Sequence, residues 1–137
     1  MTPSASGPEH SGQRPAAPPP LTVAVSVAAL EAVLLVLQGV ALLPALHGER
    51  LAMGATSVAF FVVYGGFLGY CAWQVYRLHS WARAPLVLAQ LIQILVGASF
   101  WGGPTTVVAV LAVALGLLAL AGIFHPASLA ALESDRR

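Results

Sequence analysis

Four long apolar runs, separated by short polar breaks, restrict what this chain can fold into. The runs cover about residues 21–46, 51–76, 83–101 and 104–124, and about 20 apolar residues is the length that crosses a bilayer as a helix. With 58% hydrophobic and 8% charged residues among 137, the chain has too few polar side chains to cover a soluble globule. We therefore expect an all-α membrane protein with four transmembrane helices.

The breaks between the runs predict how the helices are arranged. They read HGER at 47–50, RLHSWAR at 77–83 and GGP at 102–104. Because connections this short force consecutive helices to run antiparallel, we expect residues 21–124 to form an up-down four-helix transmembrane bundle. Pro85 and Pro104 should lie in or near the first turns of their helices, where the missing N–H costs little.

The two ends of the chain differ from this apolar domain. Residues 1–20 are rich in Pro, Ser, Gly and Ala without apolar periodicity, which predicts a disordered tail. The apolar run that follows exceeds the usual core of a secretory signal, so the tail should stay attached. In residues 125–137, Leu129 and Leu132 are spaced i, i+3 before a charged end. This pattern indicates either a short helix on the membrane surface or a fraying tail.

The arginines predict the orientation of the bundle. In a four-span arrangement, Arg50 lies on one side and the five other Arg residues lie on the other. Cytoplasmic loops carry the excess of basic residues, so both termini should be cytoplasmic. The chain has no Lys or Asn and much Ala, Gly, Pro and Arg, a composition typical of GC-rich bacterial genomes. The expected location is the bacterial plasma membrane.

Glu31 is the most informative polar residue, because it lies about ten residues into the first run, near the bilayer midplane. A carboxylic acid costs on the order of 2.5 kcal/mol or more at that depth, so Glu31 should face protein or water. Gln38, seven residues on, points to nearly the same face. Gln90 and Gln93 share one face of the third run, and Tyr64 reaches similar depth in the second. We expect Glu31 to hydrogen-bond within a cluster drawn from Gln93, Gln90 and Tyr64.

Two interpretations of this polar cluster stay open. Intramembrane acids commonly mark ion or solute pathways, which makes the cluster a candidate proton or solute site in a dimeric transporter. Polar side chains also hold helices together, each hydrogen bond contributing around 0.6 kcal/mol in membrane proteins. In that second case, replacing Glu31 by Leu should cost little if no buried partner is stranded.

Small residues four apart indicate close helix packing, as in Gly65 with Gly69 and Ala112 with Gly116. Such pairs serve packing within a chain more often than a dimer face. The sequence contains no metal-ligand, nucleotide-binding or catalytic motif and no basic patch for nucleic acid. We therefore expect no enzymatic activity, metal or cofactor. The expected partners are the lipid bilayer and either a second copy or an unknown membrane protein.

Two resemblances to known families follow from particular stretches. ALEAVLLV, with a glutamate inside the first of four short spans, resembles the small multidrug resistance transporters, in which such an acid binds protons and cationic drugs in a dimer. The Pro-rich tail, the arginine asymmetry and the RLHSWAR loop depart from that family. RLHSWARAPLVLAQLIQILVG at 77–97 and the later HPASLAALE are similar to uncharacterised small four-span membrane proteins of high-GC Gram-positive bacteria. That likeness implies topology and source, and no activity.

Overall fold

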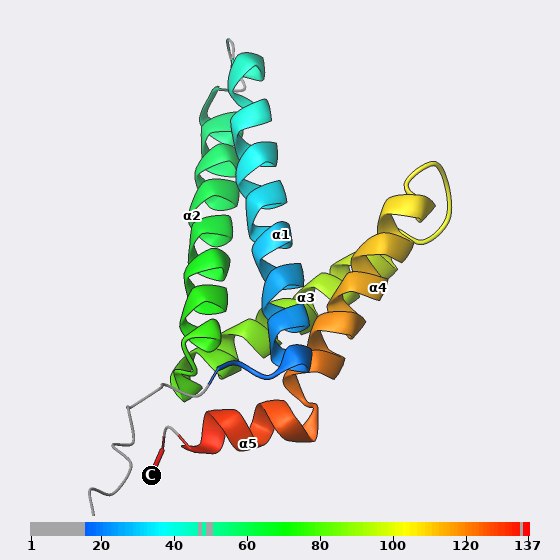
Figure 1. Ribbon diagram of the computed structural model, residues 1–137. Helices are drawn as coiled ribbons and strands as arrows, with labels where there is room; N and C mark the ends of the chain where they lie inside the picture. The colour runs from blue at the N-terminus through cyan, green and yellow to red at the C-terminus, as the bar shows by residue number, and fades with distance from the viewer. Residues whose placement is uncertain (1–15, 47, 49–50, 135) are drawn as a thin grey trace, which may run out of the picture.

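The computed structural model confirms the all-α fold (Figure 1). The structure describes residues 16–46, 48, 51–134 and 136–137. Its four long helices are long and apolar enough to cross a membrane, which makes the chain a multi-pass membrane protein. They are α1 (Pro19–Ala41), α2 (Leu51–Tyr76), α3 (Arg83–Ser99), whose span includes the preceding turn from Ser80, and α4 (Thr106–Ile123).

Three short elements complete the described chain. The 3-10 helix η1 (Leu43–Ala45) follows α1, η3 (Ser80–Ala82) leads directly into α3, and α5 (Pro126–Ser134) follows α4. Most of the predicted tail, residues 1–15, and most of the HGER break lie outside the described residues.

Two helices start two residues from their predicted positions. Helix α1 begins at Pro19, inside the predicted tail, because proline is well tolerated in a first helical turn. Helix α4 begins only at Thr106, so Pro104 lies in the preceding turn. The cause is the glycine pair before it: Gly102 and Gly103 both have positive φ (97° and 106°), which no helical residue adopts. Pro85 lies in the first turn of α3, as predicted.

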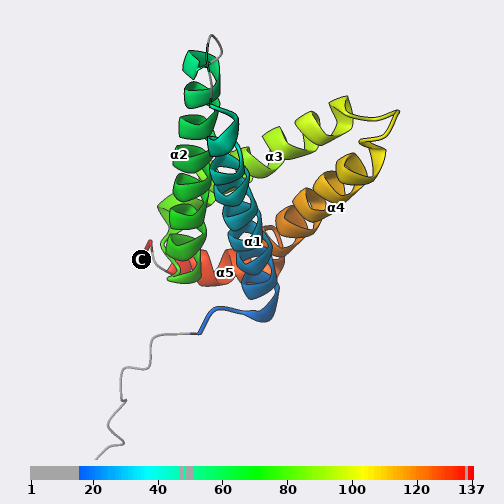
Figure 2. The ribbon, with the colours of Figure 1, turned by 90° about the horizontal axis from the view of Figure 1, so that it is seen from above.

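The long helices form two antiparallel hairpins, α1–α2 and α3–α4, that meet in a V (Figures 1 and 2). The closest helix pairs are α1 with α2 and α3 with α4, and α1 also packs on α4, whereas α2 and α3 touch little. We call the end where the hairpins meet the closed end, and the end with the two hairpin tips the open end. The up-down order is as predicted, while the divergence of the hairpins was not.

The closed end packs tightly because small residues let helix backbones approach. A Cβ at Gly122 of α4 would lie 2.5 Å from the carbonyl oxygen of Pro20 and 2.8 Å from Cβ of Ala24 on α1. Ala24 itself is completely buried. The main hydrophobic core lies at this end and draws on every helix; its members include Leu21, Ala28, Leu68, Cys71, Val75, Leu86, Ile123 and Leu132.

Helix α5 closes this end of the molecule, so residues 125–137 contain a short helix, and its predicted place on the membrane surface stays a prediction. Leu132 is 1% exposed, and the Ser128 hydroxyl donates a hydrogen bond to the carbonyl of Gly122 at 2.6 Å. Because α5 contacts both α1 and α4, it is a packed part of the fold.

The turn between the hairpins contains a leucine in a conformation that favours glycine. Leu78 has φ of 66°. Its N–H donates to the carbonyl of Val75 and that of His79 donates to the carbonyl of Gln74, both at 2.9 Å, the pattern of a Schellman helix end. A non-glycine residue there costs roughly 1–2 kcal/mol, offset in part by packing of the Leu78 side chain on the core.

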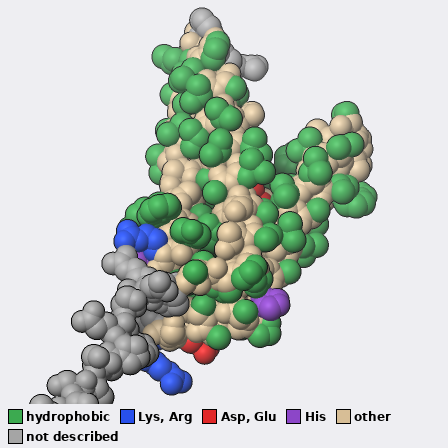
Figure 3. All heavy atoms as spheres, in the orientation of Figure 1, with side chains coloured by type: hydrophobic (Ala, Val, Ile, Leu, Met, Phe, Trp, Pro, Cys, Tyr) green, Lys and Arg blue, Asp and Glu red, His purple; other side chains and the backbone are tan. Residues whose placement is uncertain are grey.

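Hydrophobic side chains cover much of the outside of both hairpins (Figure 3). Met53, Val63 and Leu95 are more than two-thirds exposed, at 75%, 71% and 71%. Such a surface suits acyl chains and not water. Large aromatic side chains are exposed in the same way; they include Trp73, Tyr76, Trp81, Phe100 and Trp101.

Candidate functional site

Glu31 lies on α1 and points at α3, with only 5% of its surface exposed. The amide nitrogen of Gln90 donates to Oε2 of Glu31 at 2.6 Å, and that of Gln93 donates to Oε1 at 2.7 Å. Each carboxylate oxygen therefore accepts one amide N–H. The predicted contact of Glu31 with Gln90 and Gln93 is confirmed, and we call these three residues the Glu31 cluster.

Helical spacing accounts for the convergence of the two amides on one acid. Gln90 and Gln93 are three residues apart on α3, so both side chains leave the same face of the helix. The Gln93 nitrogen also donates to the carbonyl oxygen of Ala112 on α4 at 3.1 Å. One polar network thus joins α1, α3 and α4.

The cluster bridges the two hairpins near the level where they diverge. Helices α1 and α3 are not among the closely packed pairs, so the long side chains span the distance between them. Beyond Ala32, the one buried residue of α1 is Gly39, which packs on Phe61 and Val62 of α2 within the first hairpin. The Glu31 cluster is therefore a link at the base of the V.

Gln90 has an unused hydrogen-bonding atom in the interior. Its side chain is fully buried, and its Oε1 has no hydrogen-bond partner within the part of the chain that the structure describes. A buried acceptor without a donor is unfavourable. The cluster therefore has spare acceptors, since each carboxylate oxygen can also accept more than one hydrogen bond, and too few donors.

Two residues predicted to belong with Glu31 are placed differently. Gln38 is exposed, because α1 has separated from the second hairpin at that level. The helix face that Gln38 shares with Glu31 therefore has no helix opposite it at the level of Gln38. Tyr64 is half-buried and stacks on Phe60, with ring centroids 5.5 Å apart. Among the described contacts, no hydrogen bond joins the side chains of Tyr64 and Glu31.

The predicted small-residue pairs pack helices within the chain. A Cβ at Gly65 would lie 2.9 Å from the carbonyl oxygen of Ala32, and one at Gly69 would lie 3.4 Å from Cβ of the same residue, so this pair seats α2 on α1. In the second hairpin, a Cβ added at Gly116 would lie 2.8 Å from Cγ1 of Ile94. A Cβ added at Gly97 would lie 3.3 Å from Cβ of Ala112. Both pairs are used inside the hairpins.

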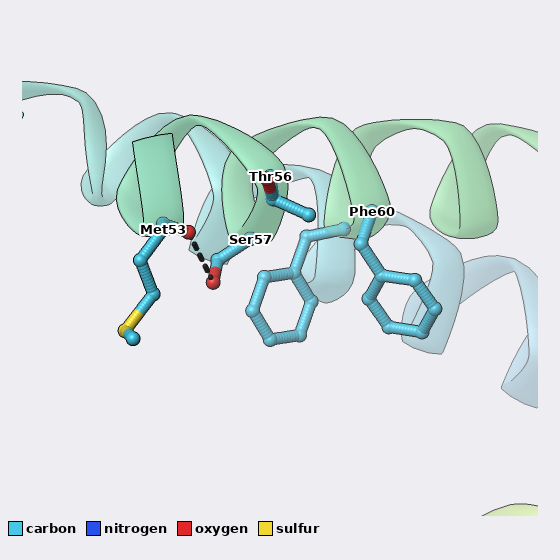
Figure 4. A pocket seen from close by; sticks show the side chains of 5 residues that line it. Met53, Thr56, Ser57 and Phe60 are labelled. Atoms are coloured by element: carbon cyan, nitrogen blue, oxygen red, sulfur yellow. Dashed lines mark hydrogen bonds between the residues drawn. The ribbon is translucent and has the colours of Figure 1, made fainter. Parts of the chain in front are cut away.

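A shallow hollow of about 530 Å³ lies near the open end of α2, away from Glu31 (Figure 4). Met53, Thr56, Ser57, Phe60 and Phe61 line it. The hydroxyls of Thr56 and Ser57 already donate to carbonyl oxygens of their own helix, at 2.8 and 3.1 Å. The hollow therefore offers mainly apolar surface.

Other candidate chemistry is sparse. Among the described residues, no group of three or more His, Cys, Asp or Glu side chains could hold a metal ion. Cys71 is a free thiol, 1% exposed in the core. The Glu31 cluster is thus the site on which a function can be argued.

No protein-family model, curated protein or solved structure matches this chain. The resemblance to small four-span proteins of high-GC Gram-positive bacteria therefore stays a prediction.

Proposed function

We propose that this chain is an accessory or structural protein of the bacterial plasma membrane, without enzymatic activity, in which the Glu31 cluster latches two helical hairpins together. The observation that supports the proposal is the pair of short hydrogen bonds from Gln90 and Gln93 to Glu31. Both cross from one hairpin to the other, and both lie in apolar surroundings.

The position of these bonds explains why they would matter. Interhelical hydrogen bonds in membrane proteins contribute around 0.6 kcal/mol on average, and bonds to a charged group contribute more. At the base of the V, even a modest contribution restrains the angle between the hairpins. The two oxygens of the Glu31 carboxyl group let it accept from both amides at once.

The latch is tested by measuring the distance between the hairpins. Spin labels at Val63 on α2 and Leu95 on α3, both 71% exposed, report that distance by double electron–electron resonance in lipid, with Cys71 replaced by Ala. Glu31→Leu removes both acceptors and strands the buried Gln90, so we expect a longer and broader distance distribution. From the sequence, we expected Glu31→Leu to cost little stability on the condition that no buried side chain loses its hydrogen-bond partner. The buried Gln90 does lose its partner, so that condition is not met.

Two further variants make the experiment specific. Glu31→Gln should keep the parent distances, because an amide can accept from Gln93 and donate to the free oxygen of Gln90. Gln38→Leu, on the same helix but outside the cluster, should also keep them. Parent-like distances in Glu31→Leu would contradict the latch.

We place both termini in the cytoplasm on the strength of the arginines. The described ones, Arg77, Arg83, Arg136 and Arg137, all belong to the closed end, which the positive-inside rule assigns to the cytoplasm. An impermeant maleimide applied to intact cells should label Gly48→Cys and leave Ser134→Cys unlabelled. The reverse pattern would invert the topology.

Proton-coupled transport of a small solute by a dimer is the second candidate. Its support is that acidic atoms are visible from outside between the two hairpins (Figure 3), where Glu31 keeps 5% exposure. Purified protein in liposomes with a pH gradient should then dissipate the gradient when a small cationic solute is added, as read by an enclosed pH dye, and should not do so without the solute. Glu31→Gln should stop this flux, and Glu133→Gln, which removes an exposed acid of α5, should not.

A further inference from the structure

We propose that the opening between the two hairpins receives a transmembrane helix of another protein, and that this helix carries a basic residue that pairs with Glu31. We call this opening the notch; Figure 3 shows hydrophobic side chains along both of its walls and acidic atoms at its base. The inference rests on the proposed accessory function and names the class of partner.

The first argument is charge. Glu31 is an acid inside a transmembrane helix, and the chain has no Lys at all and no Arg inside the four long helices, apart from Arg83 at the first position of α3. An unpaired carboxylate is costly in a low-dielectric interior, and intramembrane acids commonly pair with basic groups. The chain therefore presents an intramembrane acid without a counter-charge at that depth.

The second argument is the balance of donors and acceptors. Among the described residues, the fully buried oxygen of Gln90 has no donor, and each Glu31 oxygen accepts one side-chain hydrogen bond. A lysine ammonium brings three N–H donors and an arginine guanidinium brings five. A single basic side chain can thus pair with the carboxylate while the amides of Gln90 and Gln93 keep their hydrogen bonds to it, and its remaining N–H groups add donors to a cluster that is short of them.

The third argument concerns the shape and polarity of the notch. Gln38 lies two helical turns from Glu31 toward the open end, on nearly the same face of α1, and it is exposed. Glu31 and Gln38 are thus about 10 Å apart along an otherwise apolar face of α1. This arrangement suits a straight helix that lies beside α1. A partner segment at this depth must be helical, because a bilayer leaves no other way to satisfy its backbone.

Two other occupants fit less well. Acyl chains bring no donors, and lipid headgroups lie about 15 Å from the midplane, out of reach of Glu31. A second copy of this chain would bring a second intramembrane acid and no base. Charge complementarity therefore favours a different protein.

The probe is a synthetic Leu- and Ala-rich transmembrane peptide with one central Lys, flanked by Trp. Full-length protein carries a fluorescence donor at its N-terminus, the peptide carries the acceptor, and both are placed in phosphatidylcholine vesicles at neutral pH. An otherwise identical peptide with a central Leu is the matched control. We expect the Lys peptide to associate at least about tenfold more tightly than the Leu peptide.

Variants of the protein assign that preference to the notch. Glu31→Gln should abolish it, while Glu133→Gln, which removes an acid of α5 outside the long helices, should leave it intact. Unchanged helicity by circular dichroism verifies that Glu31→Gln is folded.

Three results would overturn the inference. They are equal binding of the two peptides to the parent, a Lys preference that survives in Glu31→Gln, and self-association of the parent that depends on Glu31. The spin-label distances between the two hairpins test the latch independently of the partner helix. If Glu31→Leu opens the hairpins but the parent shows no Lys preference, the latch stands and the partner helix is wrong.

Discussion

The closed and open ends of this molecule use the same kinds of apolar residue but pack in different ways. At the closed end, Gly122 and Ala24 bring the two hairpins into contact, and α5 packs against both. Toward the open end, Gly39 and Gly97 serve contacts inside their own hairpins. Hydrophobicity alone does not bring helices together in lipid, so the backbones of the two hairpins come into close contact where small residues allow it.

The largest effect is expected where a small residue joins the two hairpins. Gly122→Ala would place a Cβ 2.5 Å from a backbone oxygen, that of Pro20, and 2.8 Å from Cβ of Ala24. Neither atom can rotate away, so α4 must shift from α1, and such overpacking costs about 1–3 kcal/mol. Unfolding by sodium dodecyl sulfate in mixed micelles, followed by circular dichroism, should show that loss. Parent stability would mean that the closed end is looser than described.

A smaller loss is expected for a contact inside the first hairpin. Gly65→Ala would bring a Cβ to 2.9 Å from the Ala32 carbonyl oxygen and 2.9 Å from a methyl group of Val36. The methyl group can rotate, so part of the clash is relieved, and we expect a loss of about 1 kcal/mol in the same unfolding assay. A cost above that of Gly122→Ala would reverse the comparison between the two ends.

The smallest effect, of opposite sign, is expected next to that contact. A Cβ at Gly66 meets no atom within 4 Å, so Gly66→Ala adds helix propensity without a clash. It should leave stability unchanged or raise it by up to about 1 kcal/mol. As the matched control for Gly65→Ala, it separates packing from propensity. A loss at Gly66 would indicate that another surface covers this face of α2.

The fold was predictable to the extent that it depends on local patterns. The second helix has the predicted bounds, 51–76, since a polar break ends each side of its apolar run. The contact of Glu31 with Gln90 and Gln93 followed from depth and helical spacing. These features need only the period of a helix and the thickness of a bilayer.

The features of the fold and of the Glu31 cluster that were not predicted depend on contacts between residues far apart in the sequence. Helical periodicity does not encode such contacts. The approach of Gly122 to Pro20 sets the joint between hairpins, and with it the isolation of Gln38. Whether the Gln90 oxygen finds a donor among the described residues depends on every side chain around it. The left-handed turn at Leu78 carries no glycine that would have predicted it.

The unequal hairpins have a consequence for hydrophobic matching. Helix α2 has 26 residues and α4 has 18, which correspond to lengths of about 39 and 27 Å against a hydrocarbon core of about 30 Å. If α4 lies along the bilayer normal, the angle between the hairpins tilts α2 away from the normal. A tilted helix of that length still spans the hydrocarbon core. Because a thicker bilayer favours a more upright long hairpin, we expect membrane thickness to set the opening angle of the V.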